Sequence, residues 1–427
     1  MRRFHHSDPG FKAAFAAFVE ERRDTPEDVD SAVRDILAAV RTEGLPALLR
    51  FARQFDGVEL DEVALRVTAE EIDTGAQQCS TEVREAIAFA AKRIRAYHER
   101  QRPADQWFTD DAGVQLGWRW TPLDAVGIYV PGGRAAYPST VLMNAVPAAA
   151  AGVGRIAMVT PPGHLQPAVL AAAREAGVSE IWRVGGAHAV AALAYGAGPI
   201  APVDKIVGPG NAFVTAAKRR VYGVVGIDAL AGPSEIVVVA DGSNRAEWIA
   251  ADLLSQAEHD PAAQAVLITD DEEFAARVET AIAAQLATLS TGHDAAASWR
   301  DHGAIVIAPL MEAPGLVDSL APEHVELAVE QPERLADRVR HAGAIFLGRH
   351  TPEAIGDYVA GSNHVLPTSR AARFSSGLSL QDFLKRTSIV KCDEAAFAAL
   401  GPATVTLAEC EGLPAHARSA AIRLGQG

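Results

Sequence analysis

Residues 181–195 read IWRVGGAHAVAALAY, and this stretch indicates the fold. A short apolar run, Ile181–Val184, leads through Gly185 and Gly186 into an alanine-rich segment of helical character. Such a sequence is typical of a βα unit, in which a buried strand turns through glycine into a helix that packs back on the sheet. A chain that repeats this unit builds a parallel sheet.

The same alternation recurs along the chain. Further short apolar runs predict strands at Val126–Val130, Ile156–Val159, Lys205–Val207, Ile236–Ala240, Val266–Thr269, Ala304–Ile307 and Ala344–Leu347. Helical stretches are expected at Ser139–Ala151, Pro167–Ala176, Ala187–Tyr195, Ala212–Val221 and Asn244–His259, with a last helix from Ala403 to Ala420. Strands that alternate with helices in this way predict mostly parallel sheets.

We expect two sheets rather than one wide sheet. The segment Ala231–Ser234 (AGPS) is typical of a break, since glycine and proline interrupt regular structure. The first hundred or so residues carry apolar residues at helical spacing, as in Val83–Tyr97, and show no convincing strand. The predicted fold class is therefore α/β with a helical beginning.

Composition excludes several classes of function. The chain has 427 residues, enough for about two or three domains. Its 39 Lys and Arg against 54 Asp and Glu give a formal charge of −15, and no basic stripe suits a nucleic acid or an anionic membrane. No membrane span or secretory signal is evident, and the three scattered cysteines fit a reduced, cytoplasmic protein.

Predicted strands lead into glycine-rich loops at Pro131–Pro138, Gly185–His188 and Gly208–Asn211. Glycine lets the backbone approach a phosphate, and a helix N-terminus offers N–H groups to it. Together the loops predict a nucleotide or dinucleotide site beyond the carboxyl ends of the strands. None is a true G-x-G-x-x-G fingerprint, and each loop alone is equally compatible with a tight turn.

Donors for a metal are spread over distant parts of the sequence. Gln256 and His259 lie three residues apart in a predicted helix, so they share a face. Asp357 lies in a second predicted helix, and His416 follows in the string EGLPAH. Two imidazoles, a carboxylate and an amide oxygen suit zinc. Taken singly, each of these residues is better explained as an exposed polar side chain.

Glu323 and His324 are candidates for catalysis. They follow Pro322, after which both side chains can point into one cleft and serve as two bases for two proton transfers. The alternative is a helix that begins at Pro322 and has Glu323 in its first turn. The sequence has no His-Glu-x-x-His, Gly-x-Ser-x-Gly or Walker motif, which excludes the best-known peptidase, hydrolase and P-loop patterns.

A series of strings carries a family resemblance. They are GIYVPGG, GPGNAFVTAAKRRVYG, GIDALAGPSEI, DLLSQAEHD, APEHVEL, AGAIFLGRHTPEAIGDYVAGSNHVLPT, ARFSSGLS and EGLPAHARS. They occur in order and with compatible spacing from about residue 25 to the C-terminus. Together they resemble the motifs of histidinol dehydrogenase.

This resemblance implies a zinc-containing, NAD-dependent enzyme that oxidises L-histidinol to L-histidine through histidinaldehyde, at the end of histidine biosynthesis. It makes Glu323 and His324 the catalytic pair. The implied zinc ligands are Gln256, His259, Asp357 and His416. The implied NAD contacts are Tyr129, His188 and Asn211. The implied substrate-binding residues are Ser234, Gln256, His259, His324, Asp357, His364, Glu411 and His416.

The resemblance also implies two Rossmann-like domains, which are incomplete dinucleotide-binding folds, in an intertwined homodimer. The expected parts are a helical N-terminal arm (1–24), a first domain with the metal and catalytic residues (25–123 and 236–377), a second domain on the NAD side (124–235) and a small C-terminal domain (378–427). The C-terminal tail would cross the dimer, so that Glu411 and His416 reach the partner's site.

One position departs from the family pattern. Histidinol dehydrogenases usually carry Gln in the string GGAQA, whereas this chain has His188 in GGAHA. An imidazole lacks the simultaneous donor and acceptor of an amide. We expect NAD binding to survive with altered affinity.

The chemistry implied for the pair is two proton transfers. His324 suits the hydroxyl proton of an alcohol, and Glu323 suits the water that hydrates an aldehyde. A thiohemiacetal would need Cys410, which we expect to be a small buried hydrophobe, so a water route is preferred. Alternatives are a dehydrogenase of the same fold that acts on another small diol, such as sulfopropanediol, or a non-catalytic metal- or nucleotide-binding protein.

Overall fold

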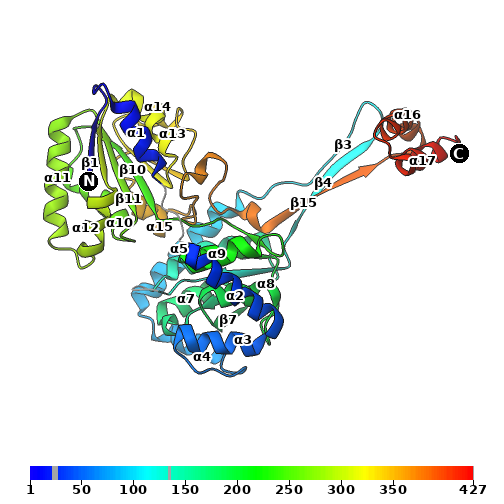
Figure 1. Ribbon diagram of the computed structural model, residues 1–427, viewed down its shortest axis with the longest axis horizontal. Coiled ribbons are helices and arrows are strands. Elements are labelled where there is room, and N and C mark those ends of the chain that lie inside the picture. Colours follow the sequence, from blue (N-terminus) through cyan, green and yellow to red (C-terminus); the bar gives the residue numbers. More distant parts are fainter. Residues whose placement is uncertain (22–26, 133–135, 427) are drawn as a thin grey trace. The chain divides into compact units, whose positions relative to one another are not determined.

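The computed structural model describes residues 1–21, 27–132 and 136–426. The chain divides into two compact units (Figure 1), of which the first comprises Met1–Gln101 and Asp124–Phe383 and the second Arg102–Leu123 and Leu384–Gly427. Two six-stranded sheets lie in the first unit, and a three-stranded sheet lies in the second. The predicted α/β class with two mainly parallel sheets is confirmed.

The first sheet is parallel throughout, in the order β1-β12-β11-β10-β13-β14. Its strands are β1 (Arg2–His5), β10 (Glu235–Ala240), β11 (Gln264–Thr269), β12 (Ala304–Ile307), β13 (His324–Ala328) and β14 (Ala344–Leu347). The sequence predicts four of these six, but not β1 or β13. The edge strand β1 reads RRFH and β13 reads HVELA, and neither is the continuous apolar run that marks a buried parallel strand.

Helices cover both faces of the first sheet. Val237 and Val239 of β10 pack in a cluster with α1 (Phe11–Glu20) and α13 (Ala313–Leu320). Ile236 and Val238 pack on the opposite face, which is covered by α10 (Ala246–Ala257), α11 (Glu272–Leu286) and α12 (Gly292–His302). Shorter segments complete this part of the chain: η3 (Leu310–Glu312), α14 (Pro332–Ala336), α15 (Glu353–Tyr358), η4 (Ala371–Arg373) and η5 (Leu380–Phe383).

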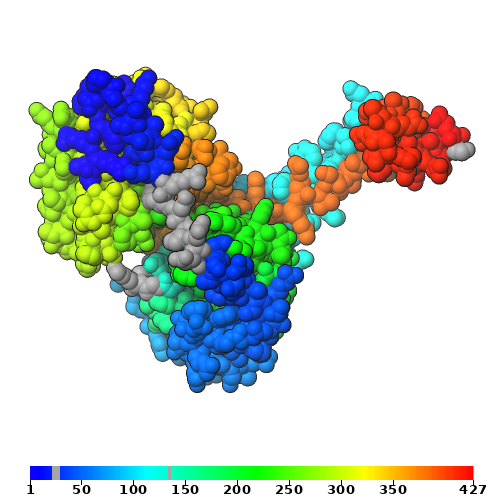
Figure 2. All heavy atoms as spheres, in the orientation of Figure 1, coloured from blue at the N-terminus to red at the C-terminus, as the bar shows by residue number. Residues whose placement is uncertain are grey.

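The N-terminal residues belong to the first sheet, which corrects the expectation of a helical arm over residues 1–24. β1 pairs with β12, with Arg2 opposite Ala304. Phe11, Phe15 and Phe18 of α1 are buried against the sheet. Figure 2 shows these N-terminal residues, in the darkest blue, next to yellow and yellow-green residues of the helices that cover the first sheet. Residues 22–24 of the expected arm lie outside the described residues.

The second sheet has the order β2-β7-β6-β5-β8-β9, and only β2 runs antiparallel to its neighbour. Its strands are β2 (Arg66–Val67), β5 (Ala125–Tyr129), β6 (Arg155–Thr160), β7 (Glu180–Arg183), β8 (Lys205–Val207) and β9 (Gly226–Ile227). The connecting helices are α6 (Pro138–Ala151), η2 (Pro162–His164), α7 (Pro167–Ala176), α8 (Gly186–Tyr195) and α9 (Ala212–Val221). The predicted helices and strands in this sheet are confirmed to within about two residues. The short strands β2 and β9 are not predicted, because a run of two residues carries no pattern.

Residues 27–99 also pack on the second sheet, whereas the expected first domain combines residues 25–123 with residues 236–377. These residues form α2 (Glu27–Glu43), α3 (Leu45–Phe51), η1 (Ala52–Asp56), α4 (Ala69–Gln78) and α5 (Thr81–Glu99). α2 contacts α8 and α9, and both α4 and α5 contact α7. An amphipathic pattern identifies a buried helical face but not the sheet that buries it, which explains the difference.

The second unit joins two distant segments of the chain. Its antiparallel sheet has the order β15-β4-β3, with β3 (Gln106–Thr109), β4 (Gln115–Pro122) and β15 (Leu384–Lys391). Residues 102–123, expected in the first domain, therefore belong with the C-terminal residues. None of these three strands is predicted, because their side chains are mostly exposed and give no apolar run.

The expected last helix, Ala403–Ala420, is two helices, α16 (Glu394–Cys410) and α17 (Pro414–Arg423). Gly412, with φ of 71°, follows α16, and Pro414 begins α17, and these residue types favour a helix end and a helix start. Cys410 is exposed at the end of α16, which corrects the expectation that it is buried. Over the described ranges, no helix combines the length and apolarity that a bilayer crossing requires.

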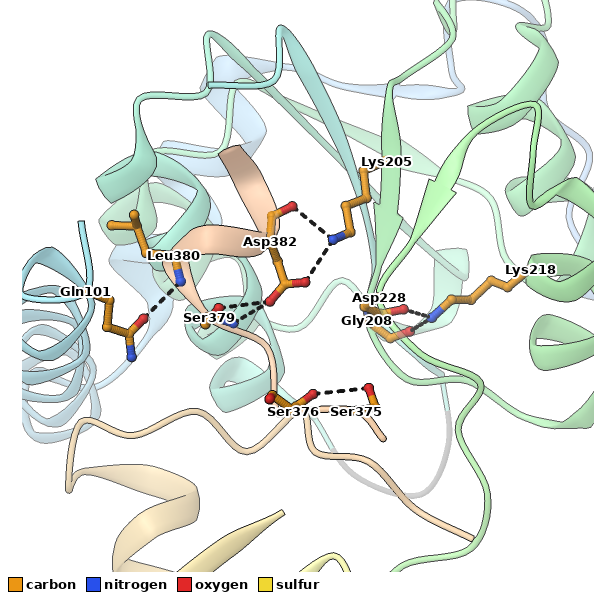
Figure 3. Close-up of polar contacts among 10 residues, drawn as sticks. All are labelled: Gln101, Lys205, Gly208, Lys218, Asp228, Ser375, Ser376, Ser379, Leu380 and Asp382. Atoms are coloured by element: carbon orange, nitrogen blue, oxygen red, sulfur yellow. Dashed lines mark hydrogen bonds and ion pairs between the residues drawn. The ribbon is translucent and has the colours of Figure 1, made fainter. Parts of the chain in front are cut away.

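Two lysines fix the loops around β8 (Figure 3). Lys218 is buried, and its ammonium donates to the Gly208 carbonyl at 2.9 Å and to Asp228. The other carboxylate oxygen of Asp228 accepts the Gly208 N–H at 2.7 Å. Lys205 donates to the carbonyl and carboxylate of Asp382, at 2.9 and 3.0 Å. The Lys218–Asp228 pair thus holds both peptide groups of Gly208.

Replacing Lys218 with Met should destabilise the protein strongly. The substitution leaves Asp228 as a buried carboxylate without its ammonium partner, and such a loss costs about 3–5 kcal/mol. Urea unfolding should show a clear fall in the free energy of unfolding. Arg34→Met, which removes one partner of the exposed Arg34–Asp35 pair, is the control and should change it little. Equal effects of the two substitutions would contradict this account.

Candidate functional site

Glu323 and His324 lie at the amino end of β13, inside the first sheet. His324 is the first residue of the strand and pairs with Ile236 of β10. Val325 and Leu327 point into the cluster with α1 and α13. Because side chains alternate along a strand, His324 and Glu326 face the opposite side, where α10 lies. The pair therefore stands on a buried strand and not at a helix start.

The backbone of Glu235 holds both side chains. Its N–H donates to Glu323 Oε2 at 3.1 Å, and its carbonyl accepts a hydrogen bond from His324 Nδ1 at 3.1 Å. A carbonyl only accepts, so the ring hydrogen lies on Nδ1. Nε2 of His324 is buried without a hydrogen-bond partner among the described residues, 3.6 Å from Asp357 Oδ1. In the neutral ring, Nε2 is a hydrogen-bond acceptor.

Two acids of α15 approach this imidazole. Asp357 lies one turn after Glu353, and Glu353 Oε1 is 3.9 Å from His324 Nε2. One ligand atom of His259 and one from each of these two acids lie within 4.8 Å of one another. Glu353 is almost fully buried and is missing from the residues that the sequence singles out. An acid at a helix start is common, so its sequence carries no distinct signal.

Gln256 and His259 lie at the end of α10. The helix ends at Ala257, so His259 follows it in a turn instead of sharing its face, and its N–H donates to the Gln256 carbonyl at 3.3 Å. Oε1 of Gln256 is buried and has no hydrogen-bond partner within the described part of the chain. A buried, unpaired amide oxygen is costly unless a ligand satisfies it.

More carboxyl groups lie behind these residues. The N–H of Glu353 donates to Glu326 Oε1, and Ser255 Oγ donates to Glu353 Oε2 at 3.1 Å. Burial raises the pKa of Asp252 to about 6 and that of Glu353 to about 8. Burial also raises the pKa of Glu326 well above its usual range. This side of the sheet therefore concentrates acidic groups away from water, an arrangement that a bound cation stabilises.

At Glu323 and His324, burial and the neighbouring charges shift the pKa values in opposite directions. Burial raises the pKa of Glu323 to about 8. Burial lowers the pKa of His324, but the nearby carboxylates of Glu323 and Asp357 outweigh it and raise that pKa to about 10. Burial raises the pKa of Asp357, but the neighbouring imidazoles of His324 and His364 outweigh it and lower that pKa to about 2. Asp357 and His324 thus stabilise each other in their charged forms.

Two further residues are expected to bind substrate. Ser234 is adjacent to Glu235 in the sequence, and His364 contacts Asp357. Ser234 directly precedes β10, and its carbonyl accepts from the Gln264 N–H at 2.9 Å. His364 Nδ1 donates to the Asp357 carbonyl at 3.1 Å, and burial lowers the pKa of His364. Ser234, Glu323 and His324 thus all lie at the amino ends of parallel strands. Ligands of such sheets usually bind at the carboxyl ends of the strands. That rule does not locate this site, because these residues lie at the amino ends.

Glu411 and His416 belong to the second unit. Glu411 is the C-cap of α16, His416 lies in α17, and both side chains are exposed. They are in a different unit from the other expected metal and substrate residues.

The glycine-rich loops lie at the carboxyl ends of β5, β7 and β8, as predicted. The Gly186 N–H donates to the Tyr129 hydroxyl at 2.9 Å, and His188 contacts Asp56 at 3.1 Å. Asn211 caps α9, with its Oδ1 accepting from Phe213 and Val214 N–H groups at 3.1 and 3.2 Å. Residues 133–135 of the first loop lie outside the described residues. A glycine is required at position 208, where φ is 109° and a Cβ would lie 2.3 Å from the Tyr129 carbonyl oxygen.

Known proteins resemble the chain over its whole length. A family model described as histidinol dehydrogenase matches residues 19–424. The histidinol dehydrogenase of Caulobacter vibrioides is 77% identical, with 100% of both chains covered. That of Rhodospirillum rubrum is 59% identical, with 100% of this chain and 99% of the relative covered. The crystal structure of histidinol dehydrogenase from Elizabethkingia anophelis has a TM-score of 0.94 at 34% identity, covering 100% of this chain and 98% of that one. The chain therefore belongs to the histidinol dehydrogenase family of oxidoreductases.

Proposed function

We propose that the protein oxidises L-histidinol to L-histidine through histidinaldehyde, with NAD as the acceptor of two hydrides, in histidine biosynthesis. One observation carries the proposal within the structure. The imidazole of His324 is held through Nδ1 by the Glu235 carbonyl, which leaves Nε2 unpaired beside Asp357, a member of the candidate metal-binding group with His259. An oriented base beside a cation-binding group suits removal of a hydroxyl proton from a bound alcohol.

The residues present fit a zinc ion. Gln256 offers a buried oxygen without a partner among the described residues, and His259 and Asp357 offer ligand atoms close to each other. These donor types suit zinc. Bound zinc supplies positive charge that grips the imidazole and amine nitrogens of histidinol. We propose Gln256, His259 and Asp357 as ligands from one chain, with Glu353 behind them.

The residues at the second sheet fit a dinucleotide. Glycine-rich loops follow β5, β7 and β8, and the Tyr129 hydroxyl lies at the first N–H groups of α8. Tyr129, His188 and Asn211 are the proposed NAD contacts. NAD, when bound, takes up the hydride in each oxidation.

The first oxidation needs one base. The carboxylates of Glu323 and Asp357 raise the pKa of His324, and a cation held by Asp357 would offset their charge, so that the ring becomes neutral. The hydroxyl proton of histidinol then passes to the neutral Nε2 as hydride leaves the adjacent carbon. Glu235 keeps the ring from rotating, since its carbonyl holds Nδ1. The products of this step are histidinaldehyde, NADH and a proton on the imidazole.

The second oxidation needs water. Glu323 is buried next to His324, with 3.8 Å between its Oε2 and His324 Nδ1. Its carboxylate takes a proton from the water that adds to the aldehyde carbon. The resulting hydrate anion passes its hydride to a second NAD and loses its remaining hydroxyl proton to solvent, which gives the carboxylate of histidine. Cys410 is exposed in the second unit, and the water route needs no thiol.

We further propose a homodimer with shared active sites in the cytoplasm. Glu411 and His416 of the partner subunit would complete the substrate pocket and the zinc coordination, together with Ser234 and His364 of the first chain. Their location on the exposed surface of the second unit supports a role toward another chain. The free cysteines Cys79, Cys392 and Cys410 fit a reducing compartment.

The purified chain should form NADH from L-histidinol. Absorbance of NADH is the measurement, and about two NADH per histidinol are expected because both oxidations occur. Removing zinc with a chelator should abolish the signal, and adding zinc back should restore it. NADH formation from sulfopropanediol but not from histidinol would instead support the alternative dehydrogenase.

The zinc content of the purified protein should depend on the proposed ligands in α15 and at the end of α10. Asp357→Asn and His259→Asn should purify with clearly less zinc per chain, because each removes a proposed ligand. Elemental analysis measures this without any assay of activity. Asp260→Asn is the matched control, since Asp260 is an exposed neighbour whose carboxylate accepts the Ala262 N–H at 2.8 Å. Full zinc occupancy in all of these variants would contradict the assignment.

Glu323→Gln should separate the two oxidations. Loss of the base for water should slow oxidation of histidinaldehyde by about a hundredfold or more, while the first hydride transfer is affected less. Single-turnover experiments should then show about one fast NADH per site in place of two. Glu330→Gln, at an exposed acid, and Cys410→Ala should behave like the unmodified protein. Unchanged aldehyde oxidation in Glu323→Gln, or its loss in Cys410→Ala, would refute the water route.

A further inference from the structure

A buried imidazole with one unused nitrogen lies at the start of α8. His188 is 1% exposed, and its Nε2 lies 3.1 Å from Asp56 Oδ2. Its Nδ1 is buried and has no hydrogen-bond partner in the described part of the chain. A carboxylate oxygen only accepts hydrogen bonds, so the ring hydrogen must lie on Nε2. In the neutral ring, Nδ1 therefore carries a lone pair.

Asp56 holds more than the imidazole. The same Oδ2 accepts the N–H of Gly185, the N-cap of α8, at 3.2 Å. Asp56 itself ends η1, a π-helical segment, and such segments are rare and occur often at functional sites. Phe51 and Phe55 lie against the ring of His188, with centroid distances of 6.1 and 6.0 Å. The ring is thus fixed both in position and in the nitrogen that bears hydrogen.

The free nitrogen points at the first turn of α8. A Cβ added to Gly186 would lie 3.3 Å from His188 Nδ1. The Gly186 N–H donates to the Tyr129 oxygen at 2.9 Å, so the Tyr129 hydroxyl hydrogen remains to be donated elsewhere. Burial raises the pKa of Tyr129 to about 12, which keeps that hydrogen in place. The turn therefore presents one fixed acceptor, His188 Nδ1, and one donor, the Tyr129 hydroxyl.

We propose that Asp56 is a positioning residue that makes His188 Nδ1 a hydrogen-bond acceptor for a ribose hydroxyl of the dinucleotide. The inference rests on the proposed use of NAD. A lone pair repels phosphate oxygens, whereas sugar hydroxyls are the donors that accompany phosphates in a dinucleotide. A glutamine at this position would present its amide oxygen by rotation and would not need Asp56. In this chain, Asp56 of η1 determines that the nitrogen facing the ligand is a hydrogen-bond acceptor.

A double-substitution experiment tests the inference. Asp56→Ala removes the oxygen that accepts the Nε2 hydrogen, so the ring hydrogen is no longer held on Nε2 and Nδ1 is no longer a fixed acceptor. We expect the dissociation constant and KM of NAD to rise about tenfold, with kcat at saturating NAD changed less than about twofold. In a His188→Gln background, Asp56→Ala should change both values much less, because an amide has no ring hydrogen for Asp56 to hold on one nitrogen. Asp73→Asn, at an exposed acid of α4 paired with Arg174, is the control and should leave NAD binding unchanged.

Nitrogen NMR of the histidine rings tests the geometry without any ligand. In the unmodified full-length chain, the His188 signals should show hydrogen on Nε2 and a bare Nδ1, and Asp56→Ala should replace this pattern with a mixture of the two tautomers. Hydrogen on Nδ1 in the unmodified protein would overturn the inference. Equal effects of Asp56→Ala in the unmodified chain and in the His188→Gln variant would overturn it too, since they indicate a structural role only. If NAD is not used at all, the proposed function fails as well, which the histidinol assay reports separately.

Discussion

The main chain of Glu235 is the point on which the candidate active site depends. Its N–H and carbonyl hold Glu323 and His324, each at 3.1 Å. These bonds exist because β10 and β13 pair in parallel with Ile236 opposite His324. A register slip of one residue would turn His324 to the other face of the sheet. The hydrogen-bonded register of a buried sheet, and not a flexible loop, therefore determines where the candidate bases lie and which nitrogen of His324 remains free.

That placement has an electrostatic cost. Glu326 and Glu353 are buried and Asp252 is half-buried on the same side of the sheet, and unpaired buried carboxylates are strongly unfavourable. Protons or a bound cation can offset this negative charge. The raised pKa values correspond to the first possibility, in which the carboxyl groups hold their protons. A proposed zinc ion would provide the second. The stability of this acidic region is therefore coupled to the binding of protons or of a cation. The buried sheet beneath it holds the carboxyl groups in position.

The parts of the fold that the sequence predicts share one property. Strands such as β10, with IVVVA, are buried on both faces and read as continuous apolar runs. β13 is buried too, but the polar residues His324 and Glu326 interrupt its apolar pattern. Glu353 escapes notice because an acid at a helix start needs no special explanation. The motifs identify Gln256, His259 and Asp357, yet only the tertiary structure reveals that Asp56 reaches His188, since 132 positions separate them.

The pairing of β1 with β12 has a consequence for how the chain is made. The strands of the second sheet all lie between residues 66 and 227, whereas those of the first sheet extend from residue 2 to residue 347. During synthesis from the N-terminus, the second sheet is complete while β1 still waits for its partner, about three hundred residues away. The second sheet and its helices can therefore fold on the ribosome as an insertion within the part of the chain that forms the first sheet. The pairing of β1 with β12 then becomes a late, long-range step.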